Sequence, residues 1–165
     1  MIPMKTLLIL RHAKSSWKEV GLPDRDRSLN KRGQRQAPEV GKRVRKLGLT
    51  PDLILSSPAK RARDTAVVVA EKCGYDGDVD LVSDFYPGAP SDYLRVLGNL
   101  PDAAQRVMLV GHNPGLEDLL AMLTLRVGTL STATLAQVEL NIDHWWQLDE
   151  DTKGRLAGMW KPGEE

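Results

Sequence analysis

The stretch KTLLILRHAKSSW, residues 5–17, decides how the rest of the chain is interpreted. Its first half is a short apolar run typical of a buried strand, and the run ends abruptly at Arg11 and His12, with Lys14 close behind. Burying so many positive groups would cost free energy unless something paired with them. We therefore expect this strand to end at solvent or at a bound anion.

The composition describes one domain with almost no overall charge. The 165 residues suffice for one core and are few for two, so we expect a single domain over residues 1–165. The formal net charge of +1 argues against a nucleic acid or an acidic membrane as partner. Cys73 is the single cysteine, and no apolar run approaches the roughly 20 residues that span a bilayer. With no signal peptide apparent, we expect a cytoplasmic protein, and we expect it to be a monomer.

Short β-type runs alternate with longer segments of helical period, which is the pattern of an α/β protein with a mostly parallel sheet. Strands are expected at 6–10, 52–57, 78–82 and 106–112, and two more, at 134–141 and 154–160, are candidates to pair at a sheet edge. Helices are expected at 30–49, 57–74, 91–100 and 113–123. Ser57 and Asn113 are the expected N-caps of two of these helices, because each is followed by a proline.

Three strands end in polar or basic residues where an α/β sheet gathers its ligand site, outside the carboxyl ends of the strands. The first strand supplies Arg11 and His12, the second leads through two serines to Arg61, and the strand at 106–112 supplies His112. Two of them run directly into a proline-started helix, whose amino end presents N–H groups and a positive dipole to an anion. Histidines, arginines and helix N-termini that converge on one crevice predict a phosphate site.

These residue types also predict a reaction. A neutral imidazole can attack phosphorus, and neighbouring cations keep it neutral by lowering its pKa. The transferring phosphoryl group carries charge on its non-bridging oxygens, which forked arginine side chains stabilise. His12 has the neighbours of a nucleophile, and Arg11, Arg61 and His112 have the chemistry of a cradle around the phosphoryl group. For His112 a structural role is also open, in which it caps the following helix together with Asn113.

Four segments, in this order, resemble the histidine phosphatase superfamily, and more closely its small SixA-type phosphohistidine phosphatases. They are LILRHAKSSW, DRDRSLNKRGQRQA, LILSSPAKRARDTA and VMLVGHNPGLEDLL. The resemblance implies a three-layer α/β sandwich like that of phosphoglycerate mutases, with a mixed, mostly parallel sheet flanked by helices. It also implies that no metal or cofactor is needed. By the same resemblance His12 becomes phosphorylated, while Arg11, Arg61 and His112 hold the phosphoryl oxygens.

The departures from the wider superfamily bear on the substrate. Ala13 stands where the larger superfamily has glycine, a change that the SixA-type branch shares. Ser15, Lys18 and Asn113 are further candidate contacts to the substrate. The insertion that carries the acidic proton donor of the mutases has no room here, and Asp84 is the nearest acid in the corresponding region. An imidazole leaving group requires less of a proton donor than an alkoxide, so the missing acid fits a phosphohistidine substrate.

Other phosphatase chemistries fit the sequence less well. A cysteine phosphatase needs an arginine six residues after its cysteine, and Val79 occupies that position after Cys73. The acids of DRDRS, at 24–28, resemble the Asp-x-Asp loop of magnesium-dependent phosphatases, but no strand precedes them, so we expect a turn there.

The sequence thus predicts a metal-independent phosphohydrolase acting on phosphohistidine of a signalling or carrier protein. Two alternatives remain at this point. One is a phosphomonoesterase for a small phosphorylated metabolite, with Asp84 or water as proton donor, and the other is a non-catalytic module that binds a phosphorylated partner. The basic segment 30–47 is a solvated face or helps to dock an acidic partner, and Trp17 lines the mouth of the site or packs beside it.

Overall fold

The computed structural model describes residues 4–163, so residues 1–3 and 164–165 of the expected single domain lie outside the described part. That part contains, in chain order, β1 (Lys5–Arg11), η1 (Asp24–Asp26), α1 (Lys31–Lys46), β2 (Leu53–Ser56), α2 (Lys60–Cys73), β3 (Asp80–Leu81), η2 (Ser83–Phe85), α3 (Pro90–Gly98), β4 (Arg106–Gly111), α4 (Gly115–Thr124), β5 (Leu135–Leu140), η3 (Trp145–Gln147) and β6 (Gly154–Trp160), where η marks a short 3-10 turn. No helix within it combines the length and the apolar character needed to cross a membrane.

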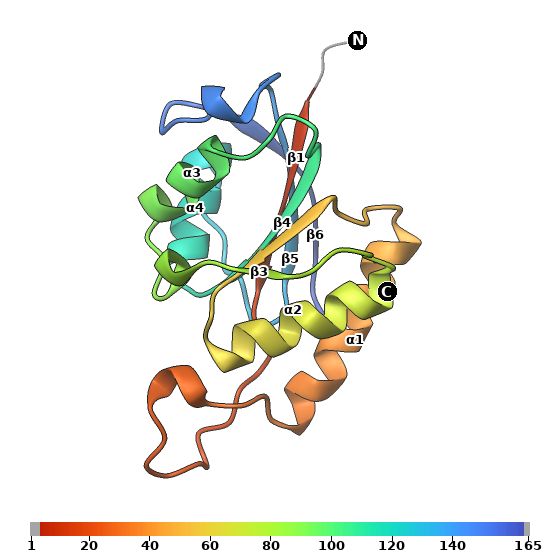
Figure 1. Cartoon of the computed structure of the whole chain (residues 1–165), viewed down its shortest axis with the longest axis vertical. Coiled ribbons are helices and arrows are strands. Elements are labelled where there is room, and N and C mark those ends of the chain that lie inside the picture. The colour runs from red at the N-terminus through yellow and green to blue at the C-terminus, as the bar shows by residue number, and fades with distance from the viewer. Residues whose placement is uncertain (1–3, 164–165) are drawn as a thin grey trace.

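The strands form one mixed sheet in the order β3-β2-β4-β1-β5-β6 (Figure 1). β4 pairs in parallel with both β1 and β2, and β2 pairs in parallel with β3. β5 runs antiparallel to β1, and β6 pairs with β5 at the edge. The mostly parallel sheet and the pairing of its last two strands confirm the sequence-based prediction. Because β1 and β4 are central neighbours, their carboxyl ends open at the same place.

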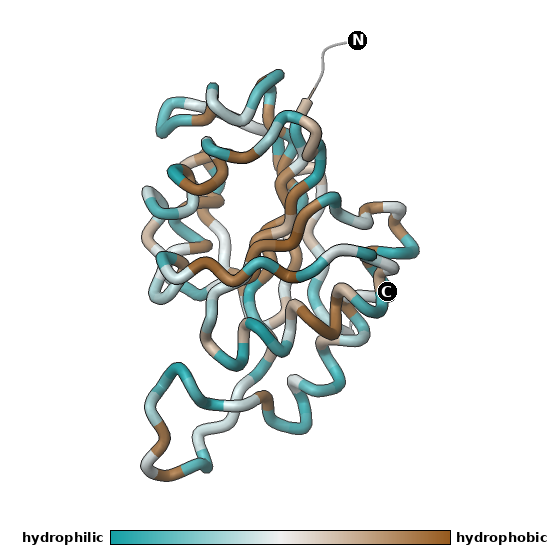
Figure 2. Tube along the Cα trace, in the orientation of Figure 1, coloured by the Kyte–Doolittle hydropathy of each residue, from teal (hydrophilic) through white to brown (hydrophobic). Residues whose placement is uncertain are grey.

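Alternate residues of β1 face two separate cores, since successive strand side chains point to opposite faces. Leu7 and Ile9 pack with the apolar faces of α3 and α4, whereas Leu8 and Leu10 pack with α1 and α2. Figure 1 shows these two helix pairs on opposite sides of the sheet, and Figure 2 shows the hydrophobic strands between them. The fold is therefore the predicted three-layer sandwich.

Two helices begin later than the sequence predicts. α2 begins at Lys60 rather than at a cap on Ser57, and α4 begins at Gly115 rather than at a cap on Asn113. The amide of Asn113 donates to the carbonyl oxygen of Leu130 at 2.8 Å instead of capping a helix. The two predicted N-caps are thus wrong, because both side chains are engaged at the carboxyl edge of the sheet.

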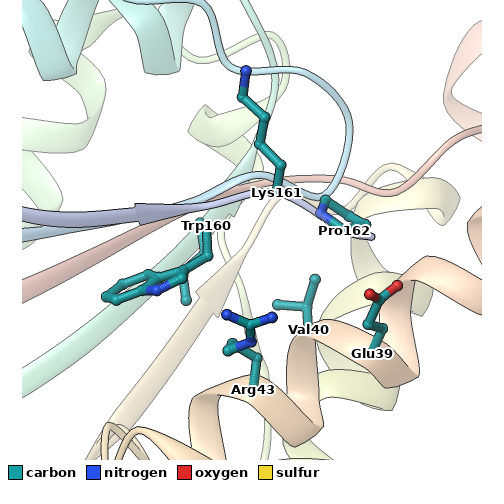
Figure 3. A pocket seen from close by; sticks show the side chains of 7 residues that line it. Glu39, Val40, Arg43, Trp160, Lys161 and Pro162 are labelled. Atoms are coloured by element: carbon teal, nitrogen blue, oxygen red, sulfur yellow. The ribbon is translucent and has the colours of Figure 1, made fainter. Parts of the chain in front are cut away.

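The segment after β6 packs against α1 (Figure 3). The backbone N–H of Gly163 donates to Glu39 Oε1 at 2.7 Å. Trp160, Val40 and Arg43 lie around a small pocket between the end of the strand and the helix. These contacts join the antiparallel edge of the sheet to one of its helix layers.

Candidate active site

The carboxyl ends of β1 and β4 bring the two predicted histidines together. Arg11 pairs with Gly111 in the register of the two strands, and the N–H of His12 donates to the carbonyl oxygen of Gly111 at 3.1 Å. His12 and His112 follow directly, and their ring centroids lie 5.1 Å apart. Both side chains are buried. Parallel strand pairing therefore builds the centre of the site.

The ring of His12 is held in one tautomer. Its Nδ1 lies 2.8 Å from the carbonyl oxygen of Ala13. Because a carbonyl oxygen can only accept a hydrogen bond, Nδ1 carries the proton and Nε2 keeps an unshared electron pair. Burial lowers the pKa of His12 to about 3, and the positive charges of Arg61 and Arg11 act in the same direction. The ring is therefore neutral at neutral pH, as a nucleophile must be.

His112 is positioned by a serine from the neighbouring strand end. Its Nε2 lies 2.7 Å from Ser57 Oγ, and Ser57 Oγ accepts a hydrogen bond from the N–H of Ala59 at 3.1 Å. Burial, together with the charge of Arg61, lowers the pKa of His112 to about 4. Within residues 4–163 its buried Nδ1 has no hydrogen-bond partner. The side chain faces the site rather than capping α4. When the Ser57 hydroxyl donates to Nε2, the neutral ring carries its proton on Nδ1, and this N–H is able to donate a hydrogen bond to a phosphoryl oxygen.

Three guanidinium groups surround the histidines. Arg11 Nη1 donates to a backbone carbonyl at 3.0 Å, and Arg27 Nη1 donates to Ser15 Oγ at 2.7 Å. Arg61, in the first turn of α2, donates from Nη1 to the carbonyl oxygen of Asp24 at 2.8 Å and from Nη2 to its Oδ2 at 3.0 Å. The Nε atoms of Arg11 and Arg61 are buried without a partner in the described part of the chain. Each of these two side chains is thus fixed by hydrogen bonds from its Nη atoms, and its Nε–H remains to donate to an anion.

Asp24 links two of these arginines, and its turn η1 confirms the turn expected at 24–28. Its Oδ1 accepts from Arg27 Nε at 3.0 Å, and its Oδ2 accepts from the hydroxyl of Tyr86 at 2.7 Å. The hydrogen bond from Tyr86, followed by those from Arg61 and Arg27, lowers the pKa of Asp24 to about 2. The carboxylate is ionised at neutral pH, so it orients the arginines and has no proton to donate.

The two histidines and the three arginines line one cavity of about 210 Å³. Its lining consists of Arg11, His12, Lys14, Ser15, Trp17, Arg27, Arg61, His112, Asn113 and Thr132. Six of the residues predicted from the sequence are therefore brought together, namely the four in catalytic roles and the candidate contacts Ser15 and Asn113. Among the described residues no group of three or more His, Cys, Asp or Glu side chains is placed to hold a metal ion.

Two predicted residues are not brought to this cavity. Lys18 is exposed in the loop that follows β1, and its backbone N–H donates to Ser16 Oγ at 3.1 Å. Asp84 lies in η2, and its carboxylate accepts from Arg95 Nη2 at 2.8 Å on the exposed side of that turn. The structure thus separates the predicted proton donor from the histidines, because a surface arginine holds it elsewhere.

Some residues of the cavity were not assigned to it from the sequence. Arg27 belongs to the segment DRDRSLNKRGQRQA, so the signal was present, but nothing in one dimension distinguished this arginine from its basic neighbours. Thr132 precedes β5 and carries no sequence signal. Trp17 does line the mouth, and its ring lies 3.6 Å from the guanidinium carbon of Arg27. This stacking explains how an exposed tryptophan contributes to a polar site.

Comparisons with known proteins agree with this geometry. Residues 7–84 match the model of the histidine phosphatase superfamily, branch 1. An uncharacterised chloroplastic protein of Arabidopsis thaliana is 33% identical over 151 residues, which cover 86% of this chain and 69% of the relative. A crystal structure from Agrobacterium tumefaciens, provisionally assigned as the phosphohistidine phosphatase SixA, is 30% identical with a TM-score of 0.79, covering 98% of this chain and 99% of the other. The protein histidine phosphatase SixA in complex with tungstate shares the fold, with a TM-score of 0.76 at 20% identity over 95% of this chain and 97% of its own.

This chain belongs to the histidine phosphatase superfamily. Its α/β sandwich is of the phosphoglycerate mutase-like type, and its structural neighbours include SixA proteins. Both the superfamily and the SixA resemblance predicted from the sequence are confirmed. Family and site together support a phosphatase activity.

Proposed function

We propose that this protein is a metal-independent phosphatase that removes the phosphoryl group from phosphohistidine on a partner protein, through a phosphorylated His12. The observation that carries the proposal is the state of His12. Its Nδ1 is bound to the carbonyl oxygen of Ala13, so Nε2 keeps an unshared electron pair, and the ring lines a cavity that guanidinium groups also line. A module that only binds phosphate has no need for a neutral imidazole in this state.

The reaction has two steps in this site. Nε2 of His12 forms a bond to phosphorus as the phosphorus–nitrogen bond of the substrate breaks. The substrate ring leaves as a neutral imidazole, because it already carries a proton on its other nitrogen. Water then attacks phosphorus, the bond to Nε2 breaks, and inorganic phosphate and neutral His12 are released. Arg11, Arg61 and His112 supply donors to the non-bridging oxygens, where negative charge is concentrated.

Two features favour phosphohistidine over a phosphate ester. The cavity of about 210 Å³ is smaller than the roughly 300–1,000 Å³ typical of small-molecule sites, so it suits a phosphoryl group presented on a protein side chain. Neither Asp24 nor the predicted donor Asp84 is suited to protonate an alkoxide. Asp24 has a pKa of about 2, and Asp84 is bound to Arg95. An imidazole leaving group makes less demand on such a donor.

The same site supports activity without a metal. In many phosphoryl-transfer enzymes a divalent cation neutralises the transferring group, and here Arg11, Arg27 and Arg61 supply positive charge at the cavity. We also propose that the enzyme works as a monomer in a reducing compartment such as the cytoplasm, where the buried thiol of Cys73 stays reduced. Light scattering during gel filtration measures the oligomeric state.

The test is steady-state turnover, in buffer containing EDTA, of a histidine-phosphorylated carrier protein, an aryl phosphate and a panel of sugar phosphates. We expect the phosphoprotein to give the highest kcat/KM. His12→Ala should lower this value by about a thousandfold or more, because it removes the nucleophile. His144→Ala is the matched control, since this exposed histidine is bound to Asp102 at 2.7 Å outside the site. Rapid acid-free quenching of the wild type should trap phosphate on His12.

Each part of the proposal fails on a different outcome. Substantial activity in His12→Ala would exclude the phosphohistidine mechanism. Efficient turnover of one sugar phosphate, with none of the phosphoprotein, would leave His12 as nucleophile and move the substrate to small molecules. Activity that EDTA abolishes and magnesium restores would exclude metal independence.

A further inference from the structure

A groove of about 720 Å³ lies beside the catalytic cavity, along the loop that precedes α1. It shares Lys14, Ser15 and Trp17 with the cavity, and it extends to Lys31 and Arg32 at the start of α1. The loop between β1 and α1 projects from the body of the molecule (Figure 1), so the groove is open to a large ligand. A protein bound there would present a side chain to His12 from one direction.

The groove has an excess of positive charge. Lys14, Lys18, Lys31 and Arg32 line it, and Glu19 is its one carboxylate, held by a serine hydroxyl. Within residues 4–163 none of the four cationic side chains makes an ion pair. Since the whole chain has a net charge of only +1, this local excess is a property of the groove. It complements a surface that carries negative charge.

Two of these cations occupy an unfavourable place in the helix. Lys31 and Arg32 lie in the first turn of α1, and no acidic residue accompanies them there. The positive end of the helix dipole disfavours cations at this position. Helix stability therefore does not account for them, whereas a negatively charged partner does.

Exposed apolar side chains adjoin the basic ones. Trp17, Val20 and Leu22 are 75%, 97% and 44% exposed on the same loop. Figure 2 shows hydrophobic positions in this projecting segment. An apolar centre with a charged rim is typical of protein interfaces, in which tryptophan is often an energetic hot spot. Val20 and Leu22 offer no ring on which a base could stack, so the combination favours a protein over a nucleic acid.

We infer that this surface, which we name the docking groove and define by Lys14, Trp17, Lys18, Lys31 and Arg32, binds an acidic protein segment next to the phosphohistidine of the partner. The inference rests on the proposed function and adds how the partner is selected. Trp17 joins the two sites, because its ring stacks on a guanidinium group that lines the cavity. Docking and phosphoryl transfer then use adjacent parts of one partner surface.

The test compares two synthetic peptides of equal length, each with one histidine phosphorylated by phosphoramidate. Aspartate and glutamate flank the histidine in one peptide, and asparagine and glutamine flank it in the other. We expect the wild type to hydrolyse the acidic peptide with a kcat/KM about tenfold above that of the neutral one, with a ratio that falls as salt is added. The double variant Lys31→Glu/Arg32→Glu should bring the ratio close to one.

A matched control separates the groove from overall charge. Lys42→Glu/Arg45→Glu makes the same change of charge on the same helix, at exposed positions outside the groove, and should keep the wild-type ratio. Turnover of p-nitrophenyl phosphate should be equal in the wild type and both variants, because Lys31 and Arg32 do not line the cavity. Circular dichroism melting should show both variants folded, and acids in the first turn favour the helix.

The outcomes distinguish this inference from the proposed function. Equal rates on the two peptides would overturn the docking groove and leave the proposed activity intact. The docking groove would also be overturned if Lys31→Glu/Arg32→Glu lost p-nitrophenyl phosphate turnover to the same extent as peptide turnover. If neither peptide is hydrolysed, the proposed substrate is wrong, and calorimetric titration of the unphosphorylated peptides decides the docking groove. Stronger binding of the acidic peptide, lost in the groove variant, would support it. Equal or absent binding would overturn it, as would groove-dependent binding of a thymidine oligonucleotide without binding of the acidic peptide.

Discussion

At the scale of single residues, the buried histidines make stability depend on pH. The pKa values of His12 and His112 are lowered to about 3 and about 4, chiefly by burial, whereas an unfolded histidine titrates near 6.5. Between these values the unfolded chain binds protons that the folded chain does not bind. The free energy of unfolding therefore rises with pH across this window. The contribution of the two histidines to stability is lost as the pH falls from about 6.5 toward 4.

We expect the free energy of unfolding to fall by about 2 kcal/mol for each of these two histidines between pH 7 and pH 5. Urea denaturation followed by tryptophan fluorescence at each pH measures this difference. The double variant His12→Gln/His112→Gln removes both titrating groups and should flatten the dependence over the same range. An equally steep dependence in that variant would show that other groups cause it.

The residues of the site differ in how far the sequence could predict them. Arg11, His12 and His112 lie at the ends of strands that the hydrophobic pattern identifies, and parallel pairing then forces these strand ends together. Arg27 and Thr132 lie in loops, whose course depends on contacts made far along the chain. The role of Arg27 follows from its bonds to Asp24 and Ser15 and from the ring of Trp17 above it, which no local pattern encodes.

At the scale of elements, α1 lies unusually close to the loop that follows His12. Gly33, in the first turn of the helix, faces the backbone of Lys14, and a Cβ atom placed on Gly33 would overlap the carbonyl oxygen of Lys14. The amide N–H of Lys14 also donates to Gln36 Oε1 at 2.9 Å. The position of the loop after His12 is thus set by the first two turns of α1.

We expect Gly33→Ala to destabilise the protein by about 1–3 kcal/mol through this overlap, although alanine is the better helix former. It should also lower kcat, because the loop that begins at His12 must shift. The control is Gly128→Ala, since an added Cβ there meets no atom within 4 Å. Denaturation midpoints and p-nitrophenyl phosphate turnover measure both effects, and a Gly33→Ala protein as active and stable as Gly128→Ala would contradict this packing.

The elements themselves were largely predictable, and their ends were not. The apolar runs locate β1, β2, β4, β5 and β6 well, because buried strands need continuous or alternating hydrophobic residues. The expected strand at 78–82 shortens to β3, whose residues Asp80 and Leu81 are exposed at the edge of the sheet. Ser57 and Asn113 have the side chains of N-caps, but Ser57 Oγ contacts Nε2 of His112 and the amide of Asn113 donates to the carbonyl oxygen of Leu130. Tertiary contacts there override a local capping preference.

At the scale of the whole molecule, one sheet separates two hydrophobic cores and supports a site that needs both. β1 contributes alternate residues to the two cores, and His12 follows at its end. α2 and its Arg61 belong to one face, whereas α4, which follows His112, belongs to the other. Loss of either core would therefore separate the residues around the cavity, so the single domain expected from chain length implies one unfolding event.

We expect chemical denaturation to show one transition, with far-ultraviolet circular dichroism, tryptophan fluorescence and loss of p-nitrophenyl phosphate turnover sharing a midpoint. A matched pair of substitutions tests this at the two faces. Ile9→Val removes a methylene from the core beneath α3 and α4, and Ile54→Val removes one from the core beneath α1 and α2, both at fully buried positions. Each should lower the free energy of unfolding by about 0.5–1.5 kcal/mol and shift all three signals together. If Ile9→Val moved one signal and Ile54→Val another, the two faces would unfold independently, and the chain would not behave as the single cooperative domain on which this site depends.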